Sequence, residues 1–228
     1  MDKRKLELVT DFYEFTMSNG FFIKNMADKT AYFDVFFREI PDNGGYVIFA
    51  GLEQIIDYVK NLKFNDEDIN YLRNKSIFCN EFLEYLRSFK FTGTIWAIPE
   101  GTVVFPNEPL ITVKAPIIEA QLLETAILCL INHQSLIATK SSRIVNAAKG
   151  RPVMEFGARR AHSIDAAVFG ARAAIIGGCV RNFLCFNSKR MECTCKSELW
   201  HTVLYKHLIL NMKLLKHMQK IILMIVLC

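Results

Sequence analysis

The segment of this 228-residue sequence best suited to chemistry is Glu155-Phe156-Gly157-Ala158-Arg159-Arg160-Ala161-His162. It follows a short apolar run typical of a strand, and α/β proteins place their sites at the carboxyl ends of strands. Two adjacent arginines offer donors to a phosphate or carboxylate, and Phe156 could stack on a planar ring. The same residues also fit a plainer interpretation, in which the arginines form surface salt bridges and Phe156 belongs to the core.

Three further positions are candidates, each with a plainer alternative. Tyr13 lies near the start of a predicted helix and could cover a ligand or pack in the core. Arg38 is predicted at a strand end, where it is either a binding residue or a solvated charge. His133, on a long predicted helix, is better explained as a buried, hydrogen-bonded side chain. We expect no metal site, because the cysteine and histidine spacing after residue 190 is unlike that of zinc ligands.

The elements that must position these residues follow from the pattern of apolar and turn residues. The spacing predicts helices over 10–20, 52–62, 80–89, 117–149 and 166–176, and strands over 31–37, 94–98, 103–105, 110–113 and 152–156. We therefore expect an α/β chain, with an N-terminal α+β domain over 1–116 and a linking helix with a strand–loop–helix unit over 117–179. Such a unit opens either an α/β barrel or a doubly wound sheet.

Composition divides the chain near residue 180. Residues 1–179 carry 20 basic and 21 acidic side chains, whereas residues 180–228 carry 8 basic and 2 acidic ones and contain no Gly, Pro, Ala or Asp. Domains keep such turn residues, so 180–228 is predicted to be aberrant. The chain has seven cysteines and no recognisable leader or long apolar span, which predicts a cytoplasmic protein with reduced thiols. Neither a nucleic acid nor a membrane is expected as a partner.

Taken in order, several motifs resemble those of nicotinate phosphoribosyltransferases. The motifs are Thr10-Asp11-Phe12-Tyr13, Phe37-Arg38-Glu39-Ile40-Pro41, Phe49-Ala50-Gly51-Leu52, Phe105-Pro106-Asn107-Glu108-Pro109, Glu119-Ala120-Gln121-Leu122-Leu123-Glu124-Thr125, Glu155 to Ala161, and Ala171 to Gly178. The resemblance covers nearly all of residues 6–180.

This resemblance implies an enzyme of NAD salvage that joins nicotinate to phosphoribosyl pyrophosphate, with ATP hydrolysis and Mg²⁺. It implies the fold of a type II phosphoribosyltransferase, an N-terminal α+β domain followed by an incomplete α/β barrel, and a homodimer with shared sites. By the same resemblance, Tyr13 would cover the pyridine ring from the partner subunit, Phe156 would stack on its other face, Arg159 would face the phosphates, and Arg38 would help.

After residue 180 the sequence departs from the family pattern, which continues with Gly-Thr-Ser and a phosphorylated-histidine segment. Shifted by one nucleotide, codons for Arg181-Asn182-Phe183 can read Gly-Thr-Ser, and those for Leu199 to Val203 can read Met-Ala-His-Ser. A frameshift is therefore expected, with an uncovered sheet edge and an unstable, inactive, truncated product without the catalytic histidine. Two alternatives stay open: a non-catalytic fragment that pairs with an intact subunit, and a relative that uses another pyridine base.

Overall fold

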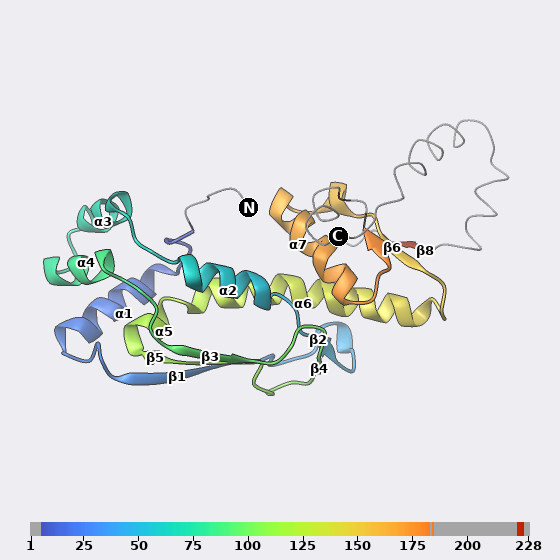
Figure 1. The fold of residues 1–228 in the computed structure, drawn as a ribbon, viewed down its shortest axis with the longest axis horizontal. Helices are drawn as coiled ribbons and strands as arrows, with labels where there is room; N and C mark the ends of the chain where they lie inside the picture. Colours follow the sequence, from blue (N-terminus) through green and yellow to red (C-terminus); the bar gives the residue numbers. More distant parts are fainter. Residues whose placement is uncertain (1–5, 183, 185–222, 226–228) are drawn as a thin grey trace. The chain divides into compact units, whose positions relative to one another are not determined.

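The computed structural model describes residues 6–182, 184 and 223–225, coloured along the chain in Figure 1. Contacts divide the chain into two compact units, each made of three segments of the sequence. Unit 1 comprises Met1–Glu39, Gly51–Pro99 and Pro106–Ile131, and unit 2 comprises Ile40–Ala50, Glu100–Phe105 and Asn132–Cys228. The fold is mixed α/β, as expected, and the predicted aberrant tail after residue 184 lies outside the described residues except for 223–225.

Unit 1 combines helices with a three-stranded antiparallel sheet. Its elements are α1 (Phe12–Ile23), β1 (Thr30–Val35), α2 (Leu52–Asn61), α3 (Asp66–Arg73), α4 (Asn80–Arg87), β3 (Thr94–Ala97), β5 (Ile111–Pro116), α5 (Ile117–Gln121) and the first part of α6 (Glu124–Ala147). Strands β1, β5 and β3 are labelled in Figure 1, and their order in the sheet is β1-β5-β3. Phe33 lies opposite Val113, and Val113 lies opposite Ile95. Along β5 the side chains alternate between buried and more exposed, because one face of the sheet meets the core and the other meets solvent.

The core of unit 1 is aromatic. Phe15, Phe64 and Phe89 pack edge to face, with ring centroids 5.8 and 5.5 Å apart. Phe82 of α4, which is fully buried, lies 5.9 Å from Phe22 of α1. Burying such rings contributes about 2–3 kcal/mol each, so these contacts hold α1 and α4 in place within the unit.

Unit 2 is organised around the second part of α6. It holds η1 (Pro41–Asn43), β2 (Val47–Ile48), β4 (Val103–Val104), β6 (Val153–Glu155), η2 (Ala158–Arg160), α7 (Ile164–Ile176), β7 (Arg181–Asn182) and β8 (Leu223–Ile225). Ser135 and Thr139 of α6 bind the backbone beside β2: the Thr139 hydroxyl accepts from Ile48 N at 2.8 Å, and the Ser135 hydroxyl accepts from Ala50 N at 3.0 Å. Side-chain hydroxyls thus satisfy backbone groups that would otherwise be buried without partners.

Helix α7 lies close to α6 within unit 2. It begins after Ser163, whose hydroxyl accepts from Ala166 N at 3.1 Å, and its buried residues are Gly170 and alanines. Arg172 of α7 makes a two-pronged ion pair with Glu100, at 2.9 and 2.6 Å, and both side chains are mostly shielded from solvent. Small side chains allow the close approach of the helices, and the ion pair fixes the register of α7 against the segment after β3.

Several predictions need correction. The helix expected over 117–149 is broken between α5 and α6, and the first helix continues past Gly20 to Ile23. Strand β1 ends at Val35, so Arg38 lies in the following loop rather than at a strand end. Strand β6 is paired on both sides, because β7 and β8 flank it and run parallel to it, so the outer strands of this sheet are β7 and β8.

Candidate functional site

The loop singled out in the sequence leaves the carboxyl end of β6 and turns through η2 into α7. Phe156 is half-buried, and Arg159 is exposed on η2. The Arg159 guanidinium carbon lies 5.6 Å from the centre of the Phe156 ring, in the range of a cation–π contact. The loop therefore presents an aromatic face and a fixed positive charge side by side, a pairing suited to a planar anionic ligand.

Glu155 anchors the base of this loop. Its side chain is buried, and its Oε1 accepts a hydrogen bond from Gly157 N at 2.5 Å. Burial raises the pKa of the Glu155 carboxyl, and the bond from Gly157 opposes that rise. The other oxygen, Oε2, has no hydrogen-bond partner within the described part of the chain. Burial shifts the Glu155 carboxyl toward its neutral form. The hydrogen bond from Gly157 N to Glu155 holds the start of the loop in place.

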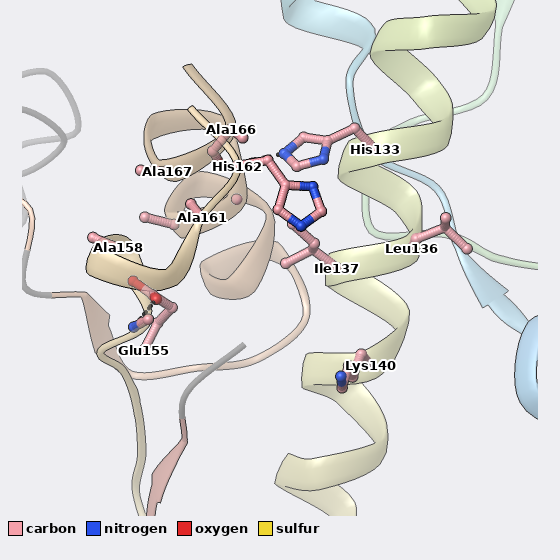
Figure 2. Close-up of a pocket in the computed structure, with 13 residues that line it drawn as sticks. His133, Leu136, Ile137, Lys140, Glu155, Ala158, Ala161, His162, Ala166 and Ala167 are labelled. Atoms are coloured by element: carbon pink, nitrogen blue, oxygen red, sulfur yellow. Dashed lines mark hydrogen bonds between the residues drawn. The ribbon is translucent and has the colours of Figure 1, made fainter. Parts of the chain in front are cut away.

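Beside the loop lies a cavity of about 280 Å³ between the second part of α6, the loop and α7 (Figure 2). One face of α6 contributes His133, Leu136, Ile137 and Lys140, at helical spacing. The remaining lining residues are mostly Ala and Gly together with His162 and Glu155. The His133 Nε2 atom lies 3.2 Å from Ala166 O, so the hydrogen-bonded state expected for His133 is observed, although the side chain is only half-buried.

Glu155 lines this cavity, but Phe156 and Arg159 do not. Consecutive residues of a strand and its extension point to opposite sides, so the stacking pair and the cavity use different faces of the same segment. Sequence reasoning did not single out Lys140 or Glu155 as cavity residues. A signal for Lys140 was present, because it lies seven residues, two helical turns, after His133 on the same face of α6.

Tyr13 and Arg38 belong to unit 1, whereas Phe156 and Arg159 belong to unit 2. Tyr13 lies in the first turn of α1, with 45% of its side chain exposed. Burial and the nearby carboxylates of Glu124 and Glu14 raise the pKa of the Tyr13 phenol. Arg38 is exposed in the loop after β1. Of the four predicted site residues, the structure brings Phe156 and Arg159 into direct contact.

The helical stretch Ile117–Ala147 is long and apolar enough to cross a membrane by length and composition alone. Half of its most apolar window is buried within the protein. One such helix is weak evidence for a membrane span, because the core helix of a soluble protein passes the same test.

The family model that matches this chain is that of the nicotinate phosphoribosyltransferase N-terminal domain, over residues 8–132. A nicotinate phosphoribosyltransferase of Mycobacterium tuberculosis is 47% identical over 171 residues, which cover 75% of this chain and 37% of that protein. The corresponding protein of Bacillus subtilis is 47% identical over 173 residues, covering 76% and 35%. The chain thus spans about a third of the length of these curated relatives.

Two solved structures are also similar to this chain. Human nicotinic acid phosphoribosyltransferase superposes with a TM-score of 0.75 and 31% identity, covering 80% of this chain and 37% of that one. A nicotinate-nucleotide pyrophosphorylase from Pyrococcus furiosus superposes with a TM-score of 0.66 at 24% identity. At that identity, the second likeness speaks to the fold alone.

Proposed function

Because this chain belongs to the family of nicotinate phosphoribosyltransferase N-terminal domains, we propose that it forms the first part of an enzyme that joins nicotinate to phosphoribosyl pyrophosphate. The products would be nicotinate mononucleotide and pyrophosphate, with ATP hydrolysis coupled to the reaction. The homologous enzymes named above support this proposal, since the similarity extends from the N-terminal unit through the loop after β6. We further propose a cytoplasmic homodimer.

The observation that carries the proposal is the contact between Phe156 and Arg159. In the proposed reaction a ribosyl carbon with oxocarbenium character forms as pyrophosphate departs, so the site must align a pyridine nitrogen and stabilise negative charge. Phe156 would stack on the pyridine ring, and Arg159, held over the Phe156 ring, would face the phosphates. Tyr13 and Arg38 would complete the site, with Tyr13 covering the ring from the partner subunit.

Mg²⁺ and ATP enter this proposal through the family alone. Within residues 6–182, 184 and 223–225, no group of three or more His, Cys, Asp or Glu side chains could hold a metal ion. Mg²⁺ is commonly held by one or two carboxylates together with substrate phosphates, and we derive no step through the ion.

We also propose that residues 180–228 are translated out of frame and that the chain as printed does not catalyse the reaction. The absence of Gly, Pro, Ala and Asp over these 49 residues supports this proposal. Re-reading the coding DNA from Gly177 to Lys220 tests it. A corrected reading that restores Gly-Thr-Ser would indicate a longer, active enzyme, whereas unchanged DNA would leave a non-catalytic fragment that could still pair with an intact subunit.

Calorimetric titration of the purified chain with nicotinate, and separately with phosphoribosyl pyrophosphate, tests the role of the loop. We expect Phe156→Leu to weaken nicotinate binding about two- to twelvefold, because the change removes a stacking contact of about 0.5–1.5 kcal/mol. Arg159→Ala should weaken binding of phosphoribosyl pyrophosphate. Arg160→Ala, at the adjacent exposed arginine, is the matched control and should weaken it less. Equal effects of the two arginine variants would contradict the assignment.

A further inference from the structure

Two motifs from the sequence, Thr10 to Tyr13 and Glu119 to Thr125, meet in unit 1 although more than a hundred residues separate them. The Thr125 hydroxyl accepts a hydrogen bond from Asp11 N at 3.1 Å and donates one to Glu14 Oε1 at 2.5 Å. The Thr10 hydroxyl donates to Leu122 O at 3.3 Å. The start of α1 is therefore fastened to the segment that joins α5 and α6.

Helix α1 depends on this external support. Asp11 occupies its N-cap position, yet the Asp11 side chain makes no capping hydrogen bond. A helix start without a side-chain cap leaves backbone donors unsatisfied and loses about 1 kcal/mol of stability. Thr125 accepts from Asp11 N, the backbone donor of the N-cap residue itself, and binds the fully buried Glu14, which is the residue next to Tyr13.

A second contact acts on Tyr13 itself. Burial raises the pKa of the Tyr13 phenol most, and the nearby Glu124 and Glu14 carboxylates add to the rise. Gln121 Nε2 in turn donates to Glu124 Oε2 at 3.0 Å, which restrains that carboxylate. Thr125 thus restrains the residues on either side of the turn that carries Tyr13, and the Tyr13 phenol lies near the Glu124 carboxylate.

We infer that Thr125 is a positioning residue for base binding. By holding Asp11 N and the Glu14 carboxyl, Thr125 fixes the start of α1 and with it the place of Tyr13 beside Glu124. The functional meaning of this inference rests on the proposed role of Tyr13 in covering the pyridine ring. The positioning itself is a property of unit 1 and can be measured without substrate.

The test is ¹⁹F NMR on the full chain labelled with 3-fluorotyrosine. The chain has seven tyrosines, and Tyr13→Phe identifies the Tyr13 resonance by its disappearance. Glu124→Gln should lower the pKa of the Tyr13 phenol toward its ordinary value near 10, because the neighbouring negative charge is removed. Thr125→Val should move the Tyr13 shift toward that of the unfolded chain, and Thr125→Ser, which keeps the hydroxyl, should restore it.

Glu119→Gln is the matched control, because Glu119 is a buried carboxyl of the same motif that binds Thr92 N and the Thr92 hydroxyl, at 2.6 and 2.9 Å, instead of α1. An unchanged Tyr13 shift and titration in Thr125→Val and Glu124→Gln would overturn the inference. So would an equal change in Glu119→Gln, which would indicate general loosening. If Tyr13 responds as expected but nicotinate does not bind, the positioning stands and the base-binding role of Tyr13 fails.

Discussion

Glu14 and Glu155 are buried carboxyl groups, each receiving one hydrogen bond from an uncharged donor. Each also has a second oxygen without a partner among the described residues. Burial raises the pKa of both groups, and for Glu14 the rise reaches about 7, with the charges of Glu124 and Asp11 adding to it. Removing such a group from water favours its protonated form, so the charge state of Glu14 changes near neutral pH.

The pKa of Glu14 predicts how stability depends on pH. The folded-state pKa of about 7 exceeds the ordinary value of 4.5, so protonation favours the folded state. The contribution is complete below about pH 4.5 and is lost as pH rises through 7, at a cost of about 3 kcal/mol. Glu14→Gln cannot ionise and should lack this loss. Urea unfolding of both proteins from pH 4.5 to 8 measures the difference, and parallel pH curves would contradict the prediction.

At the scale of elements, the approach of α7 to α6 depends on a glycine at the end of α7. A Cβ atom added at Gly177 would lie 2.3 Å from Ala138 O and 2.7 Å from Ser141 Cβ. The φ of Gly177 is −71°, so the requirement for glycine at this position is steric. The Ala138 carbonyl belongs to the backbone of α6 and cannot turn aside as a flexible side chain could. A methyl group at position 177 therefore requires α6 and α7 to move apart.

We predict that Gly177→Ala lowers the free energy of unfolding by about 1–3 kcal/mol. Gly20→Ala, within α1, is the matched control, because a Cβ at Gly20 meets nothing within 4 Å and alanine favours helix by about 1 kcal/mol. Thermal and denaturant unfolding of the two variants gives the comparison. A neutral Gly177→Ala would show that α6 and α7 are less closely packed than described.

Most elements were predictable because each has a long enough periodic pattern. The helices α2, α4 and α7 and the strands β1, β3 and β6 lie within a few residues of their predicted bounds. Helix α3 was missed although Asn65 and Asp68 form a capping box that is readable in the sequence. Strand β2 has only two residues, too few to show an alternating pattern.

The break between α5 and α6 could not be predicted, because the apolar pattern continues through it. Leu122 and Leu123 are both buried, and the Leu122 carbonyl accepts from the hydroxyl of Thr10, a residue far away in sequence. The contact of Phe156 with Arg159 could be predicted from the local sequence, since only two residues lie between them. The setting of Tyr13 was not, because it depends on Thr125 and Glu124 across more than a hundred residues.

At the scale of the whole molecule, the chain supplies about a third of its curated relatives' length and, in its last 49 residues, a composition unlike the rest. The described residues include the aromatic and cationic pair of the loop, whereas the phosphorylated-histidine segment of the family pattern is not found in the sequence. A chain that has Phe156 and Arg159 but lacks the remaining catalytic groups should bind nicotinate and phosphoribosyl pyrophosphate without converting them to products.

We therefore predict that the chain as printed releases no pyrophosphate above background from nicotinate, phosphoribosyl pyrophosphate and ATP. A coupled pyrophosphate assay measures this, with the Bacillus subtilis relative as the positive control. Turnover by the printed chain, abolished by Arg159→Ala, would contradict the prediction and would show that residues 180–228 take part in a working enzyme.

The hydroxyls of Ser135 and Thr139 have a consequence for the slow opening of unit 2. They hold the amide hydrogens of Ala50 and Ile48, 85 and 91 residues away in sequence. Those amides can exchange with deuterium only when these side-chain hydrogen bonds break, which requires the backbone beside β2 and α6 to separate. The exchange rates of the Ile48 and Ala50 amides therefore report how often α6 separates from the backbone beside β2.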